Sequence, residues 1–173
     1  LRKDYSTAPK MKNTISLIGM AGDGKSTVVR ELANILKFRL IDSDLLIEEQ
    51  QGKSLQKILD DEGYIKLREI ENSVLKNLHF REIILSTGGS DVYSDEAMKH
   101  IQKNSKVIFL DVSYNEILER VPSFSDRGFA KAPSQSIEDA FEERQELYNK
   151  YSHHIVSNTE DLHSCVSKIV ELL

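Results

Sequence analysis

The chain has 173 residues, of which 39% are hydrophobic and 29% charged, and a formal net charge of −5. These values are typical of one globular domain with one core. The acidic balance argues against a general nucleic-acid binder, because such proteins need clustered Lys and Arg. No stretch approaches the ~20 consecutive apolar residues that span a bilayer, so we expect neither a nucleic acid nor a membrane as partner.

The ends of the sequence suggest one domain with a short extension. Residues 1–10 lack the apolar centre of a signal peptide and precede Met11, so we interpret them as a cloning remnant or part of a longer parent chain, and 11–173 as the domain. Cys165 is the only cysteine and cannot form an internal disulfide, which fits a reducing compartment. We expect a cytoplasmic monomer.

Short apolar runs alternate with stretches of helical periodicity along the chain. The runs, expected to be strands, are 13–18, 38–41, 82–85, 107–110 and 154–156. The helical stretches are 25–37, 45–51, 55–61, 65–78, 95–103, 114–120, 136–150 and 161–173, with breaks at Gly52 and Gly63. Such alternation predicts a single three-layer α/β domain, with a five-stranded parallel sheet covered by helices on both faces. Residues 122–134 hold two of the three prolines and are interpreted as a mobile loop.

A phosphate-binding loop is the most specific local motif. Residues 19–26 read GMAGDGKS and match GxxxxGK[ST] between an expected strand and helix, as this motif requires. Glycines there let backbone amides and the helix N-terminus approach phosphate oxygens. Lys25 can reach the β- and γ-phosphates of ATP, and the Ser26 hydroxyl is the expected Mg²⁺ ligand. The nucleotide-binding candidates are Gly22, Asp23, Gly24, Lys25, Ser26 and Thr27; the alternative is a plain Gly-rich turn.

Two further candidate groups follow the next strands. Asp42 and Asp44 flank one residue at the expected end of the second strand, where alternation would place both carboxylates on one side. One can support Mg²⁺, and the other can accept a proton or hydrogen bond from an attacking hydroxyl. The alternative is that one of them, Asp44 for instance, only caps the next helix. Gly88 and Gly89 form a plain turn or allow amides to approach a ligand.

Residues 42–71, DSDLLIEEQQGKSLQKILDDEGYIKLREIE, resemble the shikimate kinase family. They contain its Asp-x-Asp pair, Ile-Glu, Gly-x-Ser and Arg-x-x-Glu. Gly88-Gly89, an arginine pair at 120 and 127, and Arg144 followed by Leu147-Tyr148 fall in the family's order. The resemblance covers nearly everything after residue 12 and implies the P-loop kinase fold with a mobile lid at 122–134.

The resemblance also implies roles. The residue matching Asp44 binds and helps to deprotonate the reacting hydroxyl, and that matching Asp42 supports Mg²⁺ through water. Arg68 and Arg144 match the arginines that bind the substrate carboxylate, for which a guanidinium fork is well suited. Without the resemblance, both would be interpreted as surface charges, Arg68 pairing with neighbours on its helix.

Two arginines match nucleotide-side positions of the family. Arg127 matches the lid arginine that approaches the γ-phosphate, and Arg120 the residue that packs against adenine. Catalysis is accordingly expected from Lys25, Asp44 and Arg127.

Three departures from the family pattern lie around the acceptor and lid. Ser90 replaces a third glycine, Tyr64 replaces a glutamate, and residues 127–130 read RGFA instead of Arg-Pro-Leu-Leu. The leading hypothesis is ATP- and Mg²⁺-dependent phosphorylation of shikimate, a small hydroxylated carboxylic acid. The alternatives are a kinase for another hydroxy acid or polyol such as gluconate, and a nucleotide-binding module without turnover.

Overall fold

The sheet is the centre of the molecule. The computed structural model describes residues 14–124 and 129–173, and five parallel strands lie in the order β2-β3-β1-β4-β5. These strands are β1 (Ile15–Ile18), β2 (Arg39–Asp42), β3 (Ile83–Ser86), β4 (Lys106–Asp111) and β5 (His154–Ser157). The chain extends the sheet first on one side of β1 and then on the other, so ligands are expected beyond the strand ends near β1.

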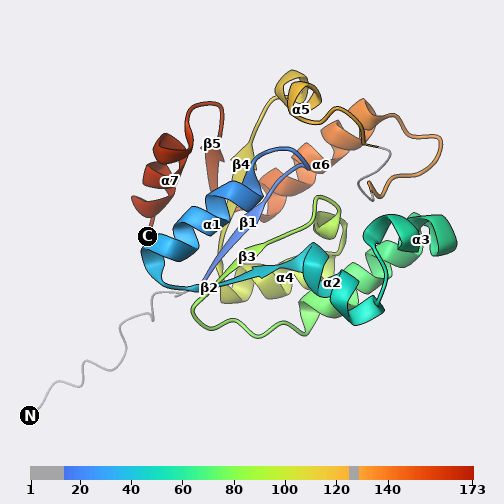
Figure 1. Cartoon of the computed structure of the whole chain (residues 1–173), viewed down its shortest axis with the longest axis horizontal. Coiled ribbons are helices and arrows are strands. Elements are labelled where there is room, and N and C mark those ends of the chain that lie inside the picture. The colour runs from blue at the N-terminus through green and yellow to red at the C-terminus, as the bar shows by residue number, and fades with distance from the viewer. Residues whose placement is uncertain (1–13, 125–128) are drawn as a thin grey trace, which may run out of the picture.

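Helices connect the strands (Figure 1). In the described part of the chain they are α1 (Lys25–Leu36), α2 (Ser43–Gln51), α3 (Leu55–Lys76), the 3-10 helix η1 (Asp91–Tyr93), α4 (Asp95–Asn104), α5 (Tyr114–Arg120), α6 (Ile137–Tyr151) and α7 (Leu162–Val170). None of these described helices is long and apolar enough to cross a bilayer.

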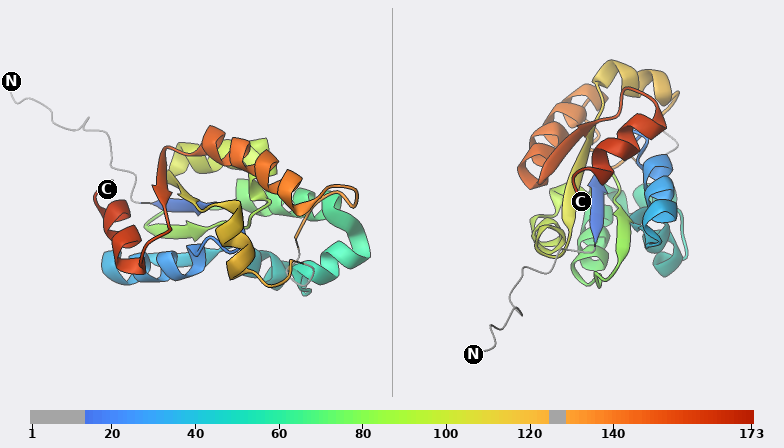
Figure 2. Two further views of the ribbon diagram at one scale, coloured as in Figure 1. Left: turned by 90° about the horizontal axis from the view of Figure 1, so that it is seen from above. Right: turned by 90° about the vertical axis from the view of Figure 1, so that its left-hand side faces the viewer.

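Both faces of the sheet are covered, as Figure 2 shows in two further views. Because side chains alternate along a strand, Leu17 and Ile108 pack in the buried cluster that includes residues of α1 and α7. Ile18 and Phe109 point the other way and pack with residues of α4 and α6. The α/β fold class, the parallel sheet and the three layers predicted from the sequence are therefore confirmed.

Two element boundaries concern the site. Residues 55–61 and 65–78 were expected as separate helices, and α3 indeed consists of two helical stretches that meet at Gly63, whose non-helical φ of 83° and ψ of 170° form a kink. Glycine tolerates this left-handed φ, which accounts for the expected break. The helix expected at 45–51 begins two residues earlier, at Ser43. The first strand was expected from residue 13, which lies outside the described residues.

Candidate active site

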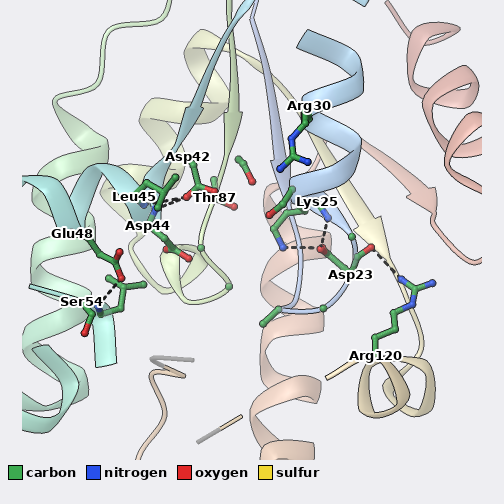
Figure 3. A pocket seen from close by; sticks show the side chains of 18 of the residues that line it. Asp23, Lys25, Arg30, Asp42, Asp44, Leu45, Glu48, Ser54, Thr87 and Arg120 are labelled. Atoms are coloured by element: carbon green, nitrogen blue, oxygen red, sulfur yellow. Dashed lines mark hydrogen bonds and ion pairs between the residues drawn. The ribbon is translucent and has the colours of Figure 1, made fainter. Parts of the chain in front are cut away.

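The phosphate loop joins β1 to α1 at the carboxyl edge of the sheet (Figure 3). Gly22 and Gly24 have φ of 88° and 91°, a region that glycine adopts without steric strain. The Lys25 ammonium donates to the carbonyls of Gly19 at 2.7 Å and Met20 at 3.0 Å. Lys25 and Ser26 line a cavity of about 770 Å³. This loop therefore presents a cation and a hydroxyl to one open space.

The Asp23 carboxylate accepts hydrogen bonds from two donors of the same loop. Its Oδ1 accepts from the Lys25 backbone N–H at 2.9 Å, and its Oδ2 lies 2.9 Å from the Lys25 Nζ. The side chain is buried, and this burial raises the pKa of the Asp23 carboxyl above its ordinary value although Lys25 opposes the shift. The backbone amide and ammonium of Lys25 are groups that this motif directs at phosphate.

Asp42 and Asp44 enter the cavity from its other side (Figure 3). Their common orientation does not come from strand alternation, as the sequence suggested, because Asp42 ends β2 whereas Asp44 lies in the first turn of α2. The helix cap is Asp42 and not Asp44: Asp42 Oδ1 accepts from the backbone N–H groups of Asp44 at 2.9 Å and Leu45 at 3.2 Å. The Asp44 carboxylate is thereby left to face the cavity.

Gly88 and Gly89 allow charged groups to approach the turn after β3. A Cβ at position 88 would lie 2.3 Å from Asp44 Oδ1, and one at position 89 would lie 3.0 Å from an Arg144 terminal nitrogen. The first distance is far below van der Waals contact, so a side chain at position 88 would have to displace the Asp44 carboxylate. This turn therefore lies between the carboxylate and the guanidinium that the sequence assigned to one substrate.

Two buried carboxyl groups, Glu71 and Asp91, and the part-buried Asp44 lie around this turn. Burial is the main reason that the pKa of Asp44 rises to about 6, and the Asp42 charge adds to it while Lys25 opposes it. Burial likewise raises the pKa of Glu71 to about 7, against a hydrogen bond donated by the Ser90 hydroxyl. The pKa of Asp91 is raised well above its ordinary value by burial and by the other two carboxylates. Such values favour a carboxylate that exchanges protons near neutral pH.

Arg68 and Arg144 converge on one oxygen. A terminal nitrogen of Arg144 donates to the Ala130 carbonyl at 2.6 Å, and one of Arg68 reaches the same carbonyl at 3.4 Å. The intrahelical partners considered for Arg68 are not what it contacts; its Cζ lies 3.6 Å from the centre of the Tyr93 ring. Arg144 is 1% exposed and is a buried cation, not a solvated one.

Arg120 ties the phosphate loop to the loop after β5. It donates to the backbone carbonyls of Asp23 at 3.3 Å and Asn158 at 2.8 Å, and the Asn158 side chain donates to the same Asp23 carbonyl at 2.6 Å. Arg120 also lines the cavity. Its position at the end of α5, beside the loop, is compatible with the expected place next to the nucleotide.

Most of the predicted site residues lie together. Those that line the cavity are Gly22, Asp23, Gly24, Lys25, Ser26, Asp42, Asp44, Gly88, Gly89 and Arg120. Arg68 and Arg144 are not lining residues. Arg144 lies next to Gly89, and both arginines lie near enough to Glu71 to interact with its charge. Thr27 is not among the lining residues, and Arg127 lies outside the described residues.

Sequence reasoning missed two residues of the site. Asp91 Oδ2 accepts from the Ser43 hydroxyl at 2.7 Å and the Gly88 amide at 2.8 Å, and it thus joins the start of α2 to the glycine turn. Its position three residues after Gly88, in a polar turn, is a signal that could have identified it, because Asp side chains commonly bond turn amides. No local pattern marks Tyr93, whose partners come from distant segments.

This fold and this site define a class of protein. A phosphate loop facing a carboxylate at the carboxyl edge of a parallel sheet is the arrangement of a P-loop phosphotransferase. The shikimate kinase family model matches residues 21–173, and the chain belongs to that family. It is accordingly a small-molecule kinase that uses ATP as phosphate donor.

Individual relatives agree with the family assignment. The chain is 38% identical to the shikimate kinase of Sulfurihydrogenibium sp. over 139 residues, which is 80% of this chain and 83% of the relative. Among solved structures, Aquifex aeolicus shikimate kinase is 30% identical, with a TM-score of 0.79 over 91% of this chain and 94% of that one. A structure described as Acinetobacter baumannii shikimate kinase in complex with shikimate is 28% identical, with a TM-score of 0.83 over 92% and 91%.

Proposed function

We propose that this protein transfers the γ-phosphoryl group of ATP to a hydroxyl of shikimate, giving shikimate 3-phosphate and ADP. The observation that carries the proposal is the position of three groups around the glycine turn: the phosphate loop, the Asp44 carboxylate, and the pair of Arg68 and Arg144. Similarity to named shikimate kinases, one of them in complex with shikimate, supports the same acceptor.

The proposed acceptor half holds the acid at two points. Arg68 and Arg144 bind its carboxylate through their N–H groups, as guanidinium forks do. Asp44, across Gly88, accepts a hydrogen bond and then the proton from the reacting hydroxyl. A pKa of about 6 leaves this carboxylate mostly ionised at pH 7 while keeping it basic enough to accept the proton.

The proposed nucleotide half stabilises charge. Amides at the start of α1 and the Lys25 ammonium bind phosphate oxygens and offset the charge that shifts during transfer. Arg120 flanks the nucleotide. The lid function of 122–134 and the role of Arg127 at the γ-phosphate remain predictions of the same kind, because Arg127 is outside the described residues.

The residues present fit Mg²⁺. Among the described residues no group of three or more His, Cys, Asp and Glu could hold a metal, and Mg²⁺ typically needs only one or two protein oxygens beside phosphates and water. Ser26 supplies a hydroxyl on the cavity. Asp42 uses Oδ1 for both capping bonds, which leaves Oδ2 for a bound water. When bound, Mg²⁺ neutralises phosphate charge.

A steady-state assay tests the proposed function. ADP release by the full chain is measured with ATP, Mg²⁺ and a panel containing shikimate, gluconate and no acceptor. We expect turnover that saturates with shikimate, exceeds that with gluconate, and is lost without Mg²⁺. Binding of ATP without turnover of any acceptor would support a nucleotide-binding module instead.

A further inference from the structure

The two substrate-side arginines contact aromatic rings closely, and the nearby Glu71 carboxylate interacts with both only through its charge. In the stretches 14–124 and 129–173, no carboxylate oxygen lies within 4.0 Å of a guanidinium nitrogen of Arg68 or Arg144. The Nε–H of each is buried without a hydrogen-bond partner among those residues. Buried cations normally have an anionic partner, because desolvating an unpaired charge is unfavourable. Arg144 is buried and Arg68 part-buried, and the Glu71 charge acts on both without an ion pair within 4.0 Å. Both arginines therefore depend on further stabilisation and keep donors for a ligand.

Three rings surround the pair. The Arg68 Cζ lies 3.6 Å from the centre of the Tyr93 ring and 5.0 Å from that of Tyr64. The Arg144 Cζ lies 4.1 Å from the centre of the Phe129 ring and 5.5 Å from that of Tyr93. Tyr93 is thus the ring that both guanidinium groups share.

A ring and a carboxylate stabilise a cation with different consequences. A carboxylate accepts the N–H groups and cancels the charge, so it competes with an anionic substrate. An aromatic face attracts the cation through its quadrupole but leaves the N–H edge free. The convergence of Arg68 and Arg144 on the Ala130 carbonyl shows that both edges are directed at one point.

We propose that Tyr93 is a positioning residue for recognition of the substrate carboxylate: its ring holds Arg68 and Arg144 with their N–H edges on one anion site. This inference rests on the proposed function. Tyr64 and Phe129 each support one arginine, and Tyr93 couples the two. The Ala130 carbonyl marks the site, and a carboxylate replaces this neutral acceptor because its hydrogen bonds to guanidinium are charge-assisted.

The experiment compares three variants of the full chain in the ADP-release assay. Tyr93→Leu removes the ring, Tyr93→Phe keeps it, and Tyr114→Leu removes a ring that packs on Phe141 instead. For Tyr93→Leu we expect the KM for shikimate to rise about 5- to 30-fold, from two cation–π contacts of ordinary strength. Its kcat should stay within about threefold and its KM for ATP unchanged, because neither contact involves the nucleotide. Tyr93→Phe and Tyr114→Leu should retain wild-type constants.

A second acceptor tests the carboxylate directly. The methyl ester of shikimate lacks the negative charge, so Tyr93→Leu should reduce the preference for acid over ester by the same factor as it raises the KM. If thermal melting shows that Tyr93→Leu is unfolded, Tyr64→Leu carries the prediction, with a rise of about 2- to 5-fold for its single contact. An unchanged KM in the folded ring-deleted variant, or an equal rise in Tyr114→Leu, overturns the inference while leaving shikimate as the substrate. Absence of wild-type turnover with shikimate overturns both.

Discussion

The Asp23 carboxylate should weaken the binding of ATP. It accepts the Lys25 amide and contacts the Lys25 ammonium, each at 2.9 Å, and these are donors that the motif directs at phosphate. We therefore expect ATP to displace the carboxylate or to bind against its charge. Asp23→Asn removes the charge and keeps an oxygen for the Lys25 amide.

The size of the effect follows from charge and burial. Two unit charges about 4 Å apart interact by about 4 kcal/mol at an effective dielectric constant near 20. The repulsion between the Asp23 carboxylate and a phosphate is of this order, and so is the attraction between Asp23 and Lys25 that ATP has to overcome. Burial favours the protonated form of Asp23, which lowers the charge present and reduces the net effect. We expect a gain of about 1–2 kcal/mol, or roughly 5- to 30-fold in the Kd for ATP.

Isothermal titration with ATP and Mg²⁺ measures this gain. Asp161→Asn is the matched control, because Asp161 also accepts a helix amide, that of Ser164, and is exposed at the start of α7. The advantage of Asp23→Asn should shrink as pH falls, since protonation neutralises the wild-type carboxyl below its raised pKa. Tenfold weaker binding by a folded Asp23→Asn protein would show that the carboxylate holds Lys25 in its working position and would refute the reasoning.

Three further predictions concern the acceptor side. In wild type, kcat/KM should rise with pH through about 6, the pKa of Asp44. Asp44→Asn should lower kcat at least about a hundredfold at pH 8, where the wild-type carboxylate is ionised, and by less as pH falls below 6, within the range of positioned acid–base groups; an unchanged kcat at pH 8 removes its assigned role. Glu71→Gln should stabilise the protein at pH 8 and not at pH 4. Folding raises the pKa of the Glu71 carboxyl from 4.5 to about 7, so its protonated form contributes stability below pH 4.5 and this stability is lost as pH rises through 7. Gln cannot ionise and does not lose it. The difference approaches 3 kcal/mol and is measured by urea unfolding against exposed Glu146→Gln; equal stabilisation at both pH values contradicts it. Gly88→Ala should lower kcat/KM at least tenfold because its Cβ meets the Asp44 carboxylate, whereas Gly52→Ala, with no atom within 4 Å of its Cβ, should cost stability and not activity; equal activities would contradict the steric argument.

The sequence was most informative where chemistry depends on local spacing. The phosphate loop, the alternation of strands and helices, and the break at Gly63 are encoded within a few residues, and each was predicted. Asp42 and Asp44 were recognised as a pair, but the wrong geometry was assigned to them, because the end of a strand and the start of a helix look alike over three residues. The capping bonds to Asp44 and Leu45 place the helix start earlier than hydrophobic periodicity does.

Contacts between distant segments were beyond local patterns. Tyr93 meets Arg68 from α3 and Arg144 from α6, and nothing near position 93 indicates such partners. The raised pKa of Asp91 likewise comes from burial and from Glu71 and Asp44, none of which is visible in the residues next to it. Sequence spacing specifies which groups reach the edge of the sheet, whereas their pKa values and orientations depend on packing that only the folded chain creates.

Both halves of the site hold cations against oxygens of the protein itself. Lys25 contacts two loop carbonyls and the Asp23 carboxylate, and Arg144 donates to the Ala130 carbonyl. A ligand gains binding energy here only to the extent that its oxygens are better acceptors than these. Phosphate and carboxylate oxygens are better acceptors than a carbonyl, and a neutral hydroxyl is not. The arrangement therefore favours an acid over an uncharged polyol as acceptor, because the polyol would replace one neutral oxygen with another.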